Sequence, residues 1–183
     1  MDLSRAEFQA QLADLGLRIV PVAADGNCLF RAIAHQIEGD EEEHSRYRKM
    51  VVEYIMKHRD DFEPFVEDNV NFDEYCESMK KTGKWAGHME IQAASLLTRT
   101  NICIHRLSSP KLEIKNFNNR NIRTLHLSYH ERRHYNSAVP LDYDSYADYD
   151  SDDDYDRYGD LPSRSATASV NRQGQRQRRF IDI

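Results

Sequence analysis

The chain has 183 residues, a formal net charge of −6 at neutral pH, 39% hydrophobic residues and a mean hydropathy of −0.80. This is the length of about one domain, and no stretch approaches the roughly 20 apolar residues of a membrane-spanning helix. The first residues lack the charged and apolar regions of a signal peptide, and the three cysteines form no CxxC pair. We therefore expect a cytoplasmic protein, with the nucleus as an alternative, and no disulfide framework, cysteine zinc site or membrane partner.

Helix and strand patterns alternate in the first half of the chain. Hydrophobic residues recur at helical spacing in five segments, and Leu17–Val22 is β-branched and apolar as in a strand. In chain order we predict a helix ending near residue 15, the strand at 17–22, a helix from 28 to about 38, a helix carrying the apolar stripe of 47–55, a helix capped by Asn71 that stops by Gly83, and a helix at 89–97.

Strand patterns dominate the following part of the chain. Alternating or β-branched segments predict strands at 101–106, 112–117, 123–129 and 134–139. Because most helices precede most strands, the order indicates an α+β fold with helices flanking a mostly antiparallel central sheet.

The composition changes after Pro140. Residues 142–160 contain nine aspartates and one arginine, and only six of residues 141–183 are Leu, Ile, Val or Phe. Such a segment is too poor in apolar residues to build a core. We predict a folded domain at 1–140, large enough to be a catalytic domain, and a disordered tail at 141–183. The tail is acidic at first and then rich in Arg and Gln. A docking role for the tail remains open, while five arginines near its end are too few to indicate nucleic-acid binding by a chain of net negative charge.

Cys28 is the best candidate nucleophile among the three cysteines. It follows a turn containing Gly26 and opens a predicted helix, where free backbone N–H groups and the helix dipole favour a thiolate and can stabilise an oxyanion. Cys76 and Cys103 lie inside a predicted helix and strand, as ordinary small hydrophobic residues do. A purely structural cysteine at the helix start remains the alternative for Cys28.

A cysteine nucleophile needs a base, and His134 is well placed because it opens the last predicted strand. Asn136 follows on the same strand face, where its side chain could hold the imidazole. His126, His130 and His134 are spaced by four, which would align them as metal ligands on a helix. The segment alternates as a strand and offers no fourth ligand, so we expect no metal and no cofactor.

Three segments together resemble the ovarian-tumour (OTU) family of cysteine proteases. Asp25–Ala32 is similar to the family's nucleophile motif, His134–Ser137 to its terminal histidine motif, and Trp85–Ala93 to its Trp-Gly-Gly segment with the following Glu and Ala. The motifs occur in the family's order. Phe62–Asp68 further resembles the branch that contains OTU domain-containing protein three of animals and its plant counterparts.

The resemblance implies a papain-like fold and a thiol-dependent deubiquitinase that hydrolyses isopeptide bonds at the C-terminal glycine of ubiquitin. It implies that Cys28 attacks the carbonyl, that His134 acts as base and then acid, and that Asn136 orients His134. Asp25 is often counted with the family's catalytic residues, although its position three residues before the cysteine suits shaping the loop better. Ala86 departs from the family's first glycine after the tryptophan, and Asn136 stands where some relatives carry Asp.

The resemblance also implies partners: ubiquitin, polyubiquitin or ubiquitinated proteins. We expect a monomer. The main alternative function is a non-catalytic ubiquitin-binding module that keeps the fold. A papain-like hydrolase of another acyl group and a nucleic-acid adaptor acting through the arginine tail are the remaining alternatives, and the net charge disfavours the last.

Overall fold

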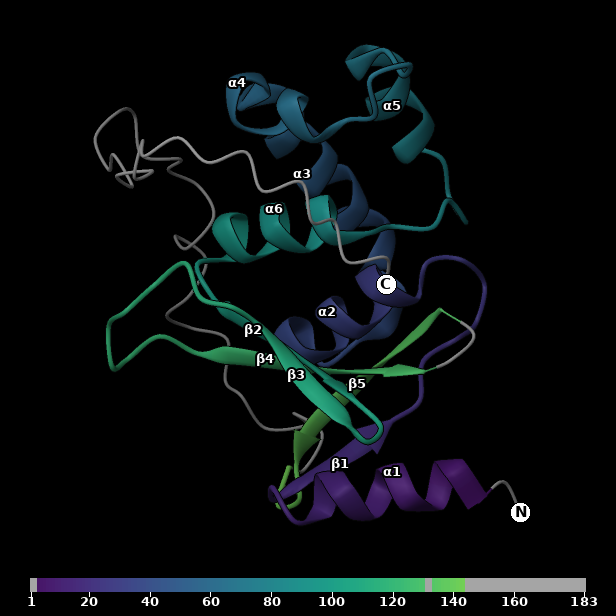
Figure 1. The fold of residues 1–183 in the computed structure, drawn as a ribbon, viewed down its shortest axis with the longest axis vertical. Coiled ribbons are helices and arrows are strands. Elements are labelled where there is room, and N and C mark those ends of the chain that lie inside the picture. Colours follow the sequence, from purple (N-terminus) through teal and green to yellow (C-terminus); the bar gives the residue numbers. More distant parts are fainter. Residues whose placement is uncertain (1–2, 131–132, 144–183) are drawn as a thin grey trace. The chain divides into compact units, whose positions relative to one another are not determined.

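The computed structural model describes residues 3–130 and 133–143, which form helices on both faces of a five-stranded sheet (Figure 1). None of these helices is long and apolar enough to cross a bilayer. The predicted disordered tail lies almost entirely outside the described residues. The elements are α1 (Leu3–Ala13), β1 (Leu17–Val20), α2 (Cys28–Glu38), the 3-10 turn η1 (Glu41–Glu43), α3 (His44–Lys57), α4 (Arg59–Phe62), the 3-10 turn η2 (Glu63–Phe65), α5 (Phe72–Met79), α6 (His88–Thr98), β2 (Asn101–Arg106), β3 (Ser109–Ile114), β4 (Thr124–His130) and β5 (His134–Pro140).

The strand order in the sheet is β1-β5-β4-β2-β3, and only the β2–β4 pair among these strands is parallel. The predicted α+β class with a mostly antiparallel sheet is therefore confirmed. In the β4–β5 pair, His130 lies opposite His134 and Ser128 opposite Asn136. This register gathers several polar side chains of the two strands near one end of the sheet.

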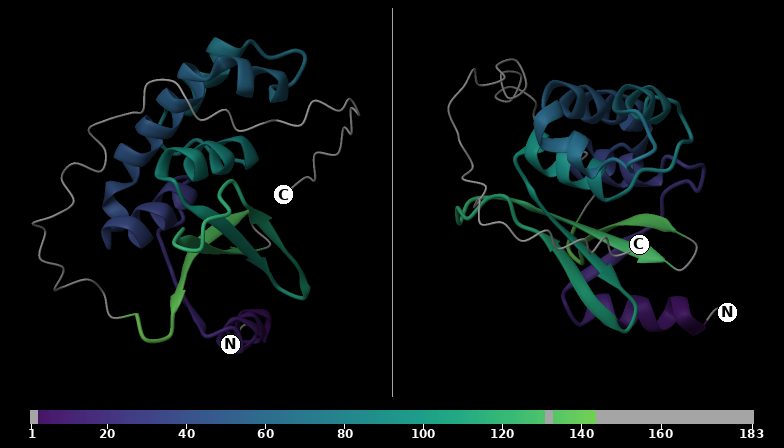
Figure 2. Two further views of the ribbon diagram at one scale, coloured as in Figure 1. Left: turned by 90° about the vertical axis from the view of Figure 1, so that its left-hand side faces the viewer. Right: turned by 45° about the horizontal axis from the view of Figure 1, so that its top comes forward.

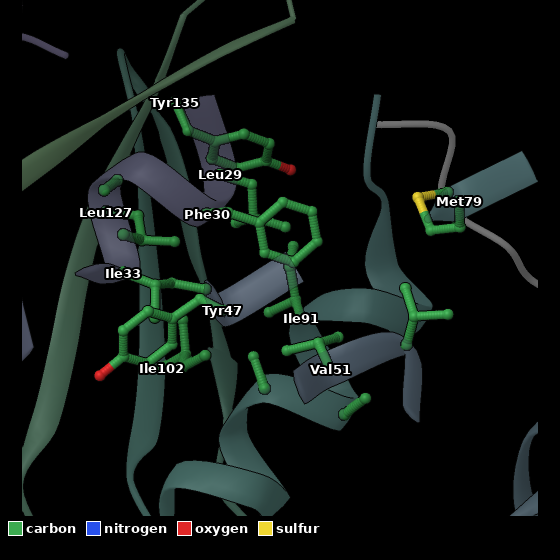
Figure 3. Close-up of a cluster of buried hydrophobic side chains, with 14 of the residues drawn as sticks. Leu29, Phe30, Ile33, Tyr47, Val51, Met79, Ile91, Ile102, Leu127 and Tyr135 are labelled. Atoms are coloured by element: carbon green, nitrogen blue, oxygen red, sulfur yellow. The ribbon is translucent and has the colours of Figure 1, made fainter. Parts of the chain in front are cut away.

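The main core lies between the sheet and helices α2, α3 and α6. Because side chains alternate along a strand, Ile102 and Ile104 of β2 face these helices, while Cys103 and His105 point to the other face. Figure 3 shows part of the core, with Leu29, Phe30 and Ile33 from α2 packed near side chains of the neighbouring helices and strands.

The opposite face of the sheet is covered by α1, as both views of Figure 2 show. Phe8 and Leu12 of α1 pack against Leu17 and Ala138 in a second, smaller core. The helix thus holds β1 and β5 together, and β5 carries His134 and Asn136.

Most predicted elements agree with the structure, and Asn71 caps α5 by accepting hydrogen bonds from Asp73 and Glu74. The predicted strand at 112–117 is wrong by three residues, since β3 spans Ser109–Ile114. Pro110 is tolerated there because β3 is an edge strand. Residues after Ile114 leave the sheet, and Phe117 is instead bonded through both its N–H and its carbonyl to the Asn101 side chain.

Candidate active site

Cys28, His134 and Asn136 line one cleft of about 850 Å³. α1 contributes part of the wall, and the segment around Trp85 contributes another part. The charged residues of the wall are arginines. The cleft is also lined by Arg5, Phe8, Val22, Gly26, Trp85, Arg106, Tyr129, His130 and Arg133.

The turn before Cys28 requires glycine at position 26. Gly26 has φ +81°, in the left-handed region, and a Cβ placed on it would collide with the backbone carbonyl of Gly83. The turn thus packs directly against the segment that joins α5 to α6. The positive φ and this close packing each favour glycine at position 26.

Asn27 and the buried Arg48 tie the nucleophile turn to that neighbouring segment. Asn27 Oδ1 accepts hydrogen bonds from Arg48 at 2.8 Å and from the Gly83 N–H at 2.7 Å. The Arg48 guanidinium also donates to the carbonyls of Met79 at 2.9 Å and Lys84 at 2.8 Å. One side chain of α3 therefore fixes both loops.

Asp25 faces Arg31 of α2, not the histidine. Its carboxylate accepts from Arg31 at 2.8 Å and from the Asn27 N–H at 3.0 Å, and the Arg31 guanidinium holds the Asp25 pKa well below its usual range. Arg31 is itself buried and binds Glu42 at 2.7 Å. The arrangement suits the loop-shaping role over a direct catalytic one.

Cys28 is the first residue of α2, and its side chain is 8% exposed. The backbone N–H of Tyr135 lies 3.5 Å from Cys28 Sγ, so the sulfur sits beside the residue that follows His134. Burial raises the pKa of the Cys28 thiol, and the backbone N–H groups of Tyr135, Leu29 and Cys28 partly oppose this rise. Burial therefore disfavours the thiolate, against the effect expected of the helix start.

His134 and Asn136 form the hydrogen bond that the sequence predicted. His134 Nε2 lies 2.9 Å from Asn136 Oδ1, and because a carbonyl oxygen only accepts, Nε2 donates. The same oxygen accepts the buried N–H of Val22 at 3.0 Å. In neutral His134 the basic nitrogen is then Nδ1.

The segment Trp85–Gly87 borders the cleft and leads into α6. Glu90 is fully buried and accepts hydrogen bonds from the Gly87 N–H at 2.7 Å and from the Tyr75 hydroxyl at 2.6 Å. Ala86 is not among the described residues with positive φ, and its side chain packs against the core. The replacement of the family's glycine by Ala86 therefore requires no strained backbone.

A second group of cysteine and histidine side chains lies on the sheet, formed by Cys103, His105 and His126. Their ligand atoms lie within 4.8 Å of one another, and His105 Nε2 is 2.9 Å from His126 Nδ1. Within the described residues it is the group that could hold a metal ion, although its two imidazoles already bond to each other. None of the three lines the cleft, and Cys103 lies inside a strand without the free amides of a helix start.

Three supporting residues escaped the sequence analysis: Arg31, Arg48 and His130. Arg31 follows Cys28 by three positions within the nucleophile motif, which is a usable signal. Arg48 stands beside the apolar stripe of α3, where an arginine normally faces solvent. His130 was considered only as a possible metal ligand, yet its Nε2 lies 3.0 Å from Asn136 Nδ2.

The comparison with family models decides the classification. The model described as "OTU-like cysteine protease" matches residues 23–149. The chain belongs to the OTU family. This confirms the resemblance drawn from the three motifs.

Individual OTU proteins support the same result. The chain is 58% identical over 137 residues to OVARIAN TUMOR DOMAIN-containing deubiquitinating enzyme 7 of Arabidopsis thaliana, covering 75% of this chain and 36% of the relative. It is 39% identical over 140 residues to OTU domain-containing protein 3 of Mus musculus, covering 76% and 35%. The chain thus spans about a third of the length of these curated relatives.

Solved structures agree with the OTU fold. The OTU domain of OTUD1 superposes with a TM-score of 0.68 at 26% identity, covering 74% of this chain and 94% of that chain. An OTU domain solved in complex with ubiquitin has a TM-score of 0.59 at 24% identity, covering 70% and 73%, and shares the fold.

Proposed function

We propose that this chain is a cysteine-type deubiquitinase that hydrolyses isopeptide bonds at the C-terminal glycine of ubiquitin. The observation that carries the proposal is the joint placement of Cys28 and His134 in one cleft. Cys28 lies at a helix N-terminus beside the Tyr135 N–H, and Asn136 occupies Nε2 of His134. This leaves Nδ1 of His134 as the base for a thiol.

The reaction follows from this geometry. As Cys28 Sγ bonds to the carbonyl carbon, its proton passes to His134 Nδ1, since burial disfavours a free thiolate at Cys28. A backbone N–H at the start of α2 can donate to the oxyanion. His134 then gives its proton to the departing lysine amine, leaving a thioester on Cys28. Water attacks the thioester while His134 takes the water's proton, and the carboxylate of ubiquitin leaves as the thiol re-forms.

Ubiquitin as the partner is supported by two comparisons. The Arabidopsis relative is named a deubiquitinating enzyme, and OTU domains of the same fold have been solved with ubiquitin bound. We also propose that the chain acts as a monomer in the cytoplasm or nucleus. The three cysteines are unpaired, as a reducing compartment requires.

A ubiquitin probe with a C-terminal electrophile tests the proposal. The wild-type chain should form a covalent adduct and cleave diubiquitin, and Cys28→Ala should do neither. Cys76→Ser and Cys103→Ser are the matched controls and should keep both reactions.

The outcomes separate the competing functions. Binding of ubiquitin without an adduct would indicate a non-catalytic module, and an adduct with a different ubiquitin-like probe alone would indicate another acyl substrate. Labelling that persists in Cys28→Ala and disappears in Cys103→Ser would move the nucleophile to the group on the sheet.

A further inference from the structure

The orientation of the Asn136 amide is determined by three neighbours. The Val22 N–H can only donate, so the amide atom 3.0 Å from it must be the oxygen. The amide nitrogen then lies on the other side, 3.0 Å from His130 Nε2. This orientation directs Oδ1 toward His134 Nε2, at 2.9 Å.

The same contacts fix the protonation of His130. An amide nitrogen only donates, so His130 Nε2 must accept, and its ring proton must lie on Nδ1. The Ser128 hydroxyl, 3.1 Å from the same nitrogen, can also donate to it. A doubly protonated His130 would place an N–H against the amide N–H of Asn136 and break this hydrogen bond.

The surroundings of His130 favour the neutral ring. Phe8 of α1 lies against it with ring centroids 5.0 Å apart. Burial lowers the pKa of His130, and the nearby charges of His134 on β5 and Arg5 on α1 lower it further. Arg106 and Arg133 are the other charged residues that line the same cleft among the described residues.

We propose that His130 is a positioning residue: by accepting from Asn136 Nδ2 it holds Asn136 Oδ1 on His134 Nε2 and so keeps Nδ1 of His134 as the base. The inference rests on the proposed hydrolase activity for its kinetic consequence. A rotated amide would aim two donors, from Val22 and His134, at Asn136 Nδ2. His130 also opposes that rotation, because its Nε2 would then face an amide oxygen that cannot donate to it.

Two substitutions separate positioning from packing. His130→Leu keeps an apolar contact with Phe8 and removes the acceptor. We expect kcat for diubiquitin cleavage to fall about tenfold, the value of one hydrogen bond, with KM within about twofold. His130→Gln restores an acceptor near the position of Nε2 without a titrating ring, and should recover most of kcat.

A double variant and a pH profile sharpen the test. Because His130 acts through Asn136, His130→Leu combined with Asn136→Ala should be no slower than Asn136→Ala alone. On the acid side, the wild-type rate should fall more steeply than the rate of His130→Gln, because the variant has no ring to protonate at position 130. Additive losses in the double variant, or an unchanged kcat in His130→Leu, would overturn the proposal.

A spectroscopic measurement is independent of turnover. Long-range ¹⁵N–¹H spectra of the full chain should place the ring proton of His130 on Nδ1 and that of His134 on Nε2 near neutral pH. A proton on Nε2 of His130 would contradict the positioning role even if the enzyme is active. The expected tautomers in a chain that cleaves no diubiquitin would instead reject the proposed function and leave the positioning geometry standing. His58 lies at the end of α3, distant in sequence from His130. His58→Gln therefore serves as the control for the assignment of the histidine signals and for kcat.

Discussion

The two halves of the cleft are held in place by different kinds of interaction. The nucleophile turn is fixed by guanidinium groups: Arg31 binds Asp25, and the buried Arg48 binds Asn27 and two carbonyls. The histidine strand is fixed by neutral groups, through the Val22 N–H and the uncharged ring of His130 on Asn136.

This difference matters because the two halves should respond differently to acid. Arginine stays protonated at all accessible pH values, and the lowered pKa of Asp25 keeps that carboxylate charged in mild acid. The imidazoles of the sheet side change charge near neutral pH unless burial holds them neutral. The cleft therefore combines a pH-insensitive nucleophile turn with a histidine strand whose geometry depends on the neutral ring of His130.

The largest effect in this comparison should come from His134. His134→Ala removes the base assigned to Cys28, so we expect kcat for diubiquitin cleavage to fall about 10³-fold. Asn136→Ala weakens orientation but keeps the base, and should lose about tenfold. Equal losses in steady-state assays would mean that Asn136 does more than orient the ring.

The turn on the nucleophile side can be broken at Arg48. Arg48→Met leaves buried carbonyls and Asn27 without their donor, and we expect the free energy of unfolding to fall by about 3 kcal/mol in urea denaturation. Arg46→Met, on the same helix, is the matched control. Arg46 is half exposed and its contact with Glu38 at 3.4 Å should contribute less than about 1 kcal/mol. Similar losses in both variants would remove Arg48 from the support of the turn.

The fold and the positions of the candidate site residues were largely predictable, and the supporting residues were not. Local patterns fix Cys28 at a helix start and His134 at a strand start, because turn formers and alternation act over a few residues. The Arg48 contacts join residues 21 to 36 positions apart, and Val22 lies 114 positions from Asn136. Such partners are chosen by tertiary packing, which no local pattern encodes. The edge strand β3 was predicted three residues too far along the chain for a related reason. Residues after Ile114 leave the sheet, and Phe117 bonds to the distant Asn101 side chain instead.

Acid should affect the sheet before the arginine-held turn, and His105 of β2, which does not line the cleft, offers a measurable case. Burial and the neighbouring His126 lower the pKa of His105 from 6.5 to about 4. Between these values the unfolded chain binds a proton that the folded chain does not, so the free energy of unfolding decreases as pH falls through this window. The decrease stops below about pH 4, where both states are protonated.

His105→Gln removes this proton linkage. The variant should lose less stability than the wild type between pH 6.5 and 4, by up to about 3 kcal/mol for a full shift of this size. Chemical denaturation at a series of pH values measures the difference. Parallel curves for the two proteins would show that His105 does not contribute to the acid sensitivity of the sheet.

The smallest effect concerns the end of β5, the strand that carries His134. The Leu141 N–H donates to the Gly16 carbonyl at 2.9 Å, and Arg18 donates to the Tyr143 carbonyl at 2.7 Å, so these contacts continue past the predicted boundary at Pro140. Truncation after Tyr143 keeps both bonds and should change the free energy of unfolding by less than about 0.5 kcal/mol, because the removed segment has few core-forming residues. Truncation after Pro140 removes both bonds and should cost about 1 kcal/mol for each.

Urea denaturation and ubiquitin-probe labelling of the two truncated chains check this, and equal stabilities would place the boundary at Pro140. A large loss in the longer truncated chain would instead show that residues beyond Tyr143 stabilise the domain.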